Sequence, residues 1–174
     1  MRFVDFLRST VMLSAGAATT LGVITVLAAG QSSDDVLVFV CAGWWIVAAA
    51  IGSLLGRRAT ATAPIARVLA DAKNATMLPE HRPGSVLINR LWPLLVSMVV
   101  AGGLAVIVPQ VTGIAAGFAI IWALAWRKQD GAVQAIEERD GVTFYVERTS
   151  PVRPIRLVRT PGFRREVPSR NGSR

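Results

Sequence analysis

The chain has 174 residues, of which 52% are hydrophobic and only 17% are charged. Its 19 Lys and Arg residues outnumber its 11 Asp and Glu residues, so its formal net charge is +8 at pH 7. Soluble domains usually carry about a quarter charged residues, so this composition argues against an ordinary cytosolic globule. The single cysteine, Cys41, excludes an intramolecular disulfide and a metal site built from several cysteines. We therefore expect a small integral membrane protein.

Four apolar stretches meet or approach the length of about 20 residues that a helix needs to cross a bilayer. They cover residues 10–29, 36–55, 91–108 and 111–126, and none contains Asp, Glu, Lys, Arg or His. Because only Pro109 and Gln110 separate the last two stretches, these should be antiparallel neighbours in a helical hairpin. The sequence predicts an all-α membrane fold, a four-transmembrane-helix bundle over residues 1–126 with a connecting loop at 56–90.

The cationic residues fall on one side of these spans. Residues 1–9 carry a net charge of +1, residues 56–90 carry +4 and residues 127–174 carry +5, whereas residues 30–35 carry −2. The positive-inside rule then predicts a multi-pass protein of the cell inner membrane, with both termini and the connecting loop in the cytoplasm. An alternative is that the first span is a cleaved signal peptide, which would leave three spans.

Small residues at a spacing of four let transmembrane helices approach one another closely. The first span has Ser14, Ala18 and Gly22 at this spacing, and the last span has Gly113 and Gly117. We expect these residues to pack helices within one chain, with a homo-oligomer interface as the alternative.

The spans hold no ionisable side chain, which weighs against a proton-driven carrier because such carriers need a charge inside the bilayer. The sequence also contains no Walker loop and no HExxH, GxSxG or CxxC motif. Glu80 and His81 form an adjacent acid–imidazole pair, and their Pro- and Gly-rich surroundings favour a solvated surface pair over a catalytic one. We therefore predict no catalytic residue, no cofactor and no metal site.

Within the connecting loop, residues 64–74 are predicted to form a short helix. Its apolar stripe consists of Ile65, Val68, Leu69 and Ala72, which recur at helical spacing. This stripe would lie flat on the inner membrane surface or pack against the C-terminal region of the protein. Both alternatives bury the same side chains.

The C-terminal region, residues 127–174, is predicted to begin as a helix that continues the last span. Gly141 should end this helix, because glycine is favoured just beyond a helix terminus. Residues 142–147 alternate apolar and polar side chains, and residues 155–159 provide a second strand for a hairpin. An isolated hairpin is only marginally stable, so it must dock on the rest of the protein or on a partner.

Residues 148–174 contain eight arginines and one glutamate. They would bind anionic phospholipid headgroups or an unknown membrane-protein partner, because each cation near an anionic surface contributes about 1 kcal/mol. The alternative is a solvated tail of the positive-inside kind, and the lack of interleaved aromatic residues disfavours nucleic acid. In a polyproline helix Arg153, Arg156 and Arg159 would share one edge, whereas in a strand Arg156 would face away from the other two. The candidate contact residues are Arg148, Arg153, Arg156, Arg159, Arg164 and Arg165.

Arginine outnumbers lysine 17 to 2, and Ala, Val and Gly are abundant, as in proteins of high-GC bacteria. The tail reads YVERTSPVRPIRLVRTPGF from Tyr145 to Phe163. With its four spans and this tail, the whole chain resembles small uncharacterised four-span actinobacterial membrane proteins. The resemblance implies no activity and no functional residue.

We therefore expect a non-enzymatic interaction or scaffold protein whose basic cytoplasmic face binds anionic lipid or a protein partner. The alternative is a small lipid-carrier translocation subunit, similar in size to four-span polyprenyl-glycan translocation proteins. That function needs a membrane-facing groove with a polar lining, for which the candidates are Thr19, Thr20, Thr25 and Ser97. Hydroxyls in spans usually bond back to their own helix, which favours the first function.

Overall fold

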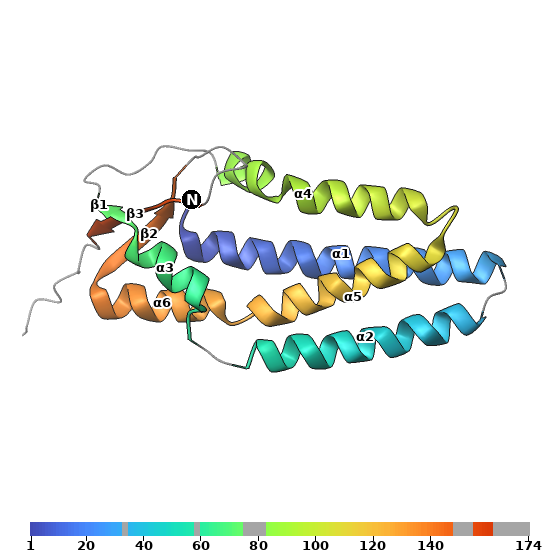
Figure 1. Cartoon of the computed structure of the whole chain (residues 1–174). Helices are drawn as coiled ribbons and strands as arrows, with labels where there is room; N and C mark the ends of the chain where they lie inside the picture. The colour runs from blue at the N-terminus through green and yellow to red at the C-terminus, as the bar shows by residue number, and fades with distance from the viewer. Residues whose placement is uncertain (33–34, 58–59, 75–82, 148–154, 162–174) are drawn as a thin grey trace, which may run out of the picture.

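The computed structural model of the chain describes residues 1–32, 35–57, 60–74, 83–147 and 155–161 (Figure 1). Four of its helices are long and apolar enough to cross a membrane. They are α1 (Phe3–Ser32), α2 (Asp35–Leu55), α4 (Pro83–Leu104) and α5 (Pro109–Trp126). The prediction of a mostly helical chain with four such helices is confirmed.

The four long helices are packed unequally. α1 and α5 make the most extensive contact, α2 packs mainly on α5, and α4 makes only small contacts with α1 and α5. Figure 1 shows α4 on one side of the α1–α5 pair and α2 on the other side. The last two spans are joined by a short connection, as predicted, but α5 packs far more with α1 and α2 than with α4.

A small mixed cap sits at one end of these helices (Figure 1). We define the cap as residues 1–9, at the start of the chain, together with two short helices and a three-stranded sheet. These elements are α3 (Ala63–Ala70), β1 (Lys73–Asn74), α6 (Gln129–Asp140), β2 (Val142–Val146) and β3 (Leu157–Pro161). The predicted hairpin therefore exists, and it gains a third strand from the connecting loop.

The sheet has the order β1-β3-β2. β2 and β3 are antiparallel, with Phe144 opposite Arg159, and β1 is parallel to β3. The first residues of the chain extend the other edge of β2, because Arg2 forms an antiparallel bridge with Tyr145 and the Val146 N–H donates to the Met1 carbonyl at 3.0 Å. The first residues of the chain are thus held in one sheet with β2 and β3.

The cap has its own apolar core. Val142, Phe144 and Val146 alternate along β2 and are all buried, which is the pattern of a strand with one covered face. The other buried members of this core come from α1, α3, α6 and β3: Phe3, Val4, Phe6, Leu7, Ile65, Leu69, Val133 and Leu157. The structure thus favours one of the two alternatives for the loop helix, because its apolar stripe packs on the C-terminal strands.

Several element boundaries differ from the sequence prediction. The third span, predicted at residues 91–108, is the helix α4 over Pro83–Leu104. The cap explains three other differences. α1 begins at Phe3 because its first two turns are part of the cap core. α3 ends at Ala70 rather than at residue 74, since the chain turns at Asp71 to form β1. The helix predicted to continue the last span is interrupted after Trp126 and resumes as α6, which ends at Gly141 (φ 63°) as expected.

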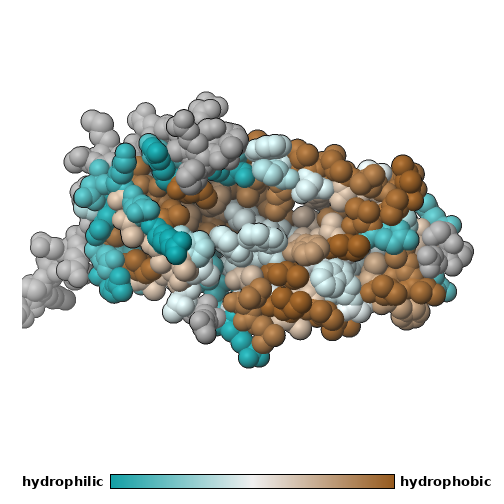
Figure 2. Space-filling model, viewed as in Figure 1, coloured by the Kyte–Doolittle hydropathy of each residue, from teal (hydrophilic) through white to brown (hydrophobic). Residues whose placement is uncertain are grey.

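The polarity of the surface changes at the boundary between the long helices and the cap. Large hydrophobic side chains are exposed along all four long helices, for example Phe39 on α2 and Val99 on α4. Figure 2 shows this brown surface over the helices and teal surface gathered over the cap. A bilayer would cover such an apolar surface, since helices satisfy their own backbone polar groups there.

Candidate functional site

Glycines on α5 let two other helices approach it closely. A Cβ atom at Gly113 would collide with the Cys41 sulfur, and one at Gly117 would collide with the indole of Trp44. On α1, Gly22 is more loosely placed, because its nearest neighbour is the Trp45 ring at 3.6 Å. Of the other small residues of the first span, Ser14 is buried and Ala18 lines a groove. The α5 glycines therefore pack helices of the same chain.

Hydrogen bonds between side chains and backbone or other side chains fix the same three helices near the start of α5. The hydroxyl oxygens of Thr25 and Thr112 lie 2.9 Å apart, and both side chains are fully buried. The indole N–H of Trp45 donates to the Gly113 carbonyl at 2.8 Å, and that of Trp44 donates to the Ile114 carbonyl at 3.3 Å. Such bonds hold helices together in lipid, so this cluster is structural.

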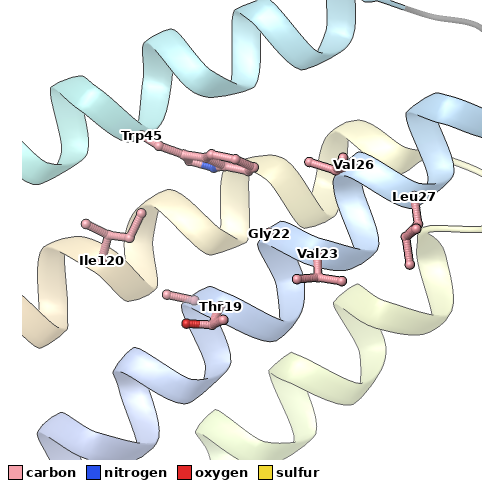
Figure 3. A pocket seen from close by; sticks show the side chains of 8 residues that line it. Thr19, Gly22, Val23, Val26, Leu27, Trp45 and Ile120 are labelled. Carbon is pink, nitrogen blue, oxygen red and sulfur yellow. The ribbon is translucent and has the colours of Figure 1, made fainter.

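One groove opens on the surface between α1, α2 and α5, and we call it the α2-side groove (Figure 3). It has a volume of about 430 Å³ and a mostly aliphatic lining. The hydroxyl of Thr19 lies in it but donates to the Ala15 carbonyl of its own helix at 3.0 Å. Its lining residues are Ala18, Thr19, Gly22, Val23, Val26, Leu27, Trp45 and Ile120.

Two further grooves flank the loosely packed α4. The first, which we call the α4 groove, has a volume of about 490 Å³ and lies between α1, α4 and α5. Its walls include Pro93, Ser97 and Trp122, and the Ser97 hydroxyl donates to the Leu94 carbonyl at 2.9 Å. The second groove, of about 590 Å³, lies nearer the end of the helices opposite the cap and includes Gln31.

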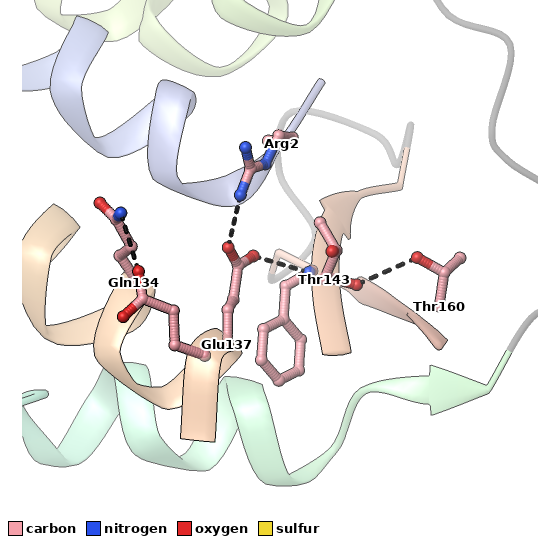
Figure 4. Close-up of polar contacts among 7 residues, drawn as sticks. Arg2, Gln134, Glu137, Thr143 and Thr160 are labelled. Atoms are coloured by element: carbon pink, nitrogen blue, oxygen red, sulfur yellow. Dashed lines mark hydrogen bonds and ion pairs between the residues drawn. The ribbon is translucent and has the colours of Figure 1, made fainter. Parts of the chain in front are cut away.

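A charged network joins α1, α6 and β2 inside the cap (Figure 4). The Arg2 guanidinium donates to one oxygen of Glu137 at 2.8 Å, and the Phe144 N–H donates to the other oxygen at 2.8 Å. The hydrogen bond to Glu137 raises the pKa of Arg2 above its usual value, so Arg2 stays charged. Both carboxylate oxygens are thus engaged in holding the fold.

The structure bears on a metal site but not on the Glu80–His81 pair. Among them, no group of three or more His, Cys, Asp and Glu side chains is placed to hold a metal ion. The Glu80–His81 pair lies outside the described residues.

Two of the six candidate arginines lie within the described residues. Arg159 is in β3 and Arg156 directly precedes it, and both are exposed. Because Arg159 lies in a strand, the polyproline alternative does not hold at this residue, whereas Arg156 lies just outside the strand. The other four, Arg148, Arg153, Arg164 and Arg165, lie outside the described residues.

Cationic residues lie near the end of each long helix that adjoins the cap, and we call this group the basic belt. Each of the four long helices brings a cation to this end, because α1 and α4 start there and α2 and α5 end there (Figure 1). The belt consists of Arg8, Arg57, Arg90, Arg127 and Lys128. At the opposite end of the helices, Asp35 is the one ionisable side chain among the described residues.

Local contacts hold parts of the basic belt in place. The Lys128 ammonium donates to the Arg57 carbonyl at 3.2 Å, which ties the end of α5 to the end of α2. Arg8 lies 3.6 Å from Asp130, and its side chain stays 68% exposed. The charges of the sequence segments already indicated that this end is cationic. Only the structure, which brings the ends of the four helices together, identified these five residues as one group.

Comparison with protein-family models, with curated proteins and with solved structures finds no match to this chain.

Proposed function

We propose that this chain is a non-enzymatic interaction protein of the inner membrane whose basic belt binds anionic phospholipid headgroups. The cap, both termini and residues 56–90 then lie in the cytoplasm, in keeping with the positive-inside rule. The supporting observation is the belt itself, which brings Arg8, Arg57, Arg90, Arg127 and Lys128 to the same end of the four apolar helices.

The position of the basic belt suits a headgroup layer. Trp126 lies at the end of α5 beside Arg127, and Trp92 lies near Arg90 in α4. Tryptophan is enriched at this level of a membrane protein, because its ring is amphipathic. Each cation near an anionic leaflet contributes about 1 kcal/mol, and an arginine can bind phosphate oxygens with two parallel hydrogen bonds.

We further propose that α1 stays in the mature protein. It contacts α5, α4, α2, α6 and β2, and its first turns supply part of the cap core. Cleavage of the first span as a signal peptide would remove this central helix from the fold.

The alternative of lipid-carrier translocation has weaker support. The polar headgroup of a lipid carrier would need hydrogen-bond partners on its way through the bilayer. The hydroxyls of Thr19, Thr20 and Ser97 each donate to a carbonyl of their own helix, and Thr25 is buried against Thr112. Grooves with such linings suit an apolar chain better than a polar headgroup.

The test of the proposed function is lipid retention by the full chain. The protein is extracted from vesicles with equal amounts of phosphatidylglycerol and phosphatidylcholine, and the retained lipids are counted by mass spectrometry. Wild type should retain an excess of phosphatidylglycerol. Arg57→Gln combined with Lys128→Gln should lower that excess by about fivefold for each cation, the factor that corresponds to ~1 kcal/mol.

The matched control combines Arg67→Gln with Lys73→Gln, which removes one exposed arginine and one exposed lysine of the cap that lie outside the basic belt. This variant should keep the wild-type excess. Equal retention of the two lipids by wild type, or equal losses in both double variants, would overturn the proposal.

A further inference from the structure

The α4 groove is an apolar recess on the side of the fold where helix packing is weakest. α4 makes only small contacts with its neighbours, and the groove separates much of it from the α1–α5 pair. The lining residues are Ala17, Leu21, Pro93, Leu94, Ser97, Met98, Ala115, Phe118, Ala119 and Trp122. Its volume of about 490 Å³ lies within the range of about 300–1,000 Å³ that is typical of small-molecule sites.

The groove points toward the basic belt. Arg90 precedes Pro93 and Leu94 by three and four positions, so it lies on the same face of α4, one turn closer to the cap. On the opposite wall, the ring of Trp122 packs against that of Trp126 at a centroid distance of 5.4 Å. Arg127 follows Trp126 at the end of α5. An apolar recess thus adjoins cations at the level of the headgroups.

We propose that the α4 groove holds one acyl chain of an anionic phospholipid whose headgroup contacts Arg90 and Arg127. This inference rests on the proposed function and adds a defined binding site to it. The apolar lining selects a hydrocarbon chain, and the adjoining positive charge selects an anionic headgroup. Burial of each methylene group in the groove contributes about 0.8 kcal/mol in water-to-apolar transfer and less from lipid, so the headgroup contacts decide the preference.

The α2-side groove has an apolar lining but, among the described residues, no cation close to it. Its lining residues nearest the cap are Ala18 and Ile120, whereas the basic belt on the same helices begins at Arg8 and Arg127. These separations correspond to about two turns of helix or more. The α2-side groove therefore lies too deep for a chain in it to place its headgroup against the belt, and it serves as the internal control.

The test uses a matched pair of substitutions. Ser97 and Thr19 are both exposed hydroxyl residues that bond to their own helix, and each lines a different groove. Ser97→Leu fills the α4 groove, and Thr19→Leu fills the α2-side groove. The full chain in nanodiscs of phosphatidylglycerol and phosphatidylcholine is released and examined by native mass spectrometry for a tightly held lipid.

Wild type should keep one phosphatidylglycerol molecule that resists removal. Ser97→Leu should reduce its retention to the level of the other lipids, because the leucine side chain occupies space in the groove that the acyl chain needs. Thr19→Leu should retain it as wild type does. Arg90→Gln should leave a held lipid but abolish the preference for phosphatidylglycerol over phosphatidylcholine.

A second variant, Ala119→Leu, fills the groove from the α5 wall and should reproduce the Ser97→Leu result. Equal retention in Ser97→Leu and wild type would overturn the groove assignment, while the overall excess of phosphatidylglycerol would still support the basic belt. Loss of the lipid in Thr19→Leu alone, or a second copy of the chain retained in its place, would also overturn the assignment. No excess of phosphatidylglycerol in wild type would reject the proposed function itself.

Discussion

The guanidinium of Arg2 lies 2.8 Å from a carboxylate oxygen of Glu137, although 135 positions separate the two residues in the sequence. The Glu137 side chain is only 4% exposed, and its second oxygen accepts the Phe144 N–H. This single side chain therefore connects the start of α1, the end of α6 and β2. It couples the cap to the central helix of the membrane-spanning part.

Replacing Glu137 should destabilise the cap strongly. Glu137→Ala removes the acceptor of two charge-assisted hydrogen bonds and leaves a buried N–H without its partner, at a cost of about 1.5–3 kcal/mol. Thermal unfolding of the purified full chain in detergent, followed by circular dichroism, should show a lower Tm. The neighbouring Glu138→Ala is the control, because Glu138 is exposed and accepts a hydrogen bond from Gln134 of its own helix. Equal Tm values for the two variants would contradict the structural role of Glu137.

Because α2 and α5 approach closely, we expect even a small side chain at Gly117 to destabilise the protein. A methyl group there would meet the Trp44 indole, so Gly117→Ala must displace that ring, which costs about 1–3 kcal/mol. Gly16 is the matched control in α1, since a Cβ at Gly16 meets nothing within 4 Å. Gly16→Ala should leave the Tm unchanged or raise it slightly, because alanine favours helix. The order of the two Tm values is the measurement, and the reverse order would refute this packing.

The buried hydroxyl pair of Thr25 and Thr112 predicts a smaller loss of stability than Gly117→Ala causes. Thr112→Val keeps the shape of the side chain but removes its hydrogen bond with Thr25 and the bond from the Thr112 hydroxyl to the Pro109 carbonyl of its own helix. Interhelical hydrogen bonds of this kind contribute about 0.6 kcal/mol on average and at most about 1.7 kcal/mol. Thr20→Val serves as the control, because the exposed Thr20 hydroxyl donates to the Gly16 carbonyl of its own helix. Unfolding in detergent should distinguish the two variants, and a larger loss for Thr20→Val would count against the pair.

The proposed orientation predicts which surfaces react with a membrane-impermeant thiol reagent. In a chain carrying Cys41→Ala, a cysteine introduced by Gln31→Cys at the end opposite the cap should react in intact cells. One introduced by Arg156→Cys in the cap should react only after the cells are opened. Both residues are exposed, so access to the side chain is equal in the folded protein. Reaction of the Arg156→Cys variant in intact cells would invert the proposed topology.

The sequence by itself determined the features that depend on residues close together in the chain. A run of about 20 apolar residues needs a bilayer wherever its neighbours lie, so the four spans followed from hydropathy. Gly141 ends α6, and alternating side chains form β2, because these signals act within a few residues. Segment charges likewise indicated that one end of the helices is cationic.

Only the tertiary structure decided the features that join distant segments. It placed Met1 and Arg2 beside β2, gave the stripe of α3 its partner and left α4 loosely packed beside a groove. Hydropathy cannot rank these pairings, because lipid and protein bury an apolar side chain almost equally well. The choice depends on shape and on specific polar contacts such as Arg2 with Glu137, which exist only once the whole chain is folded.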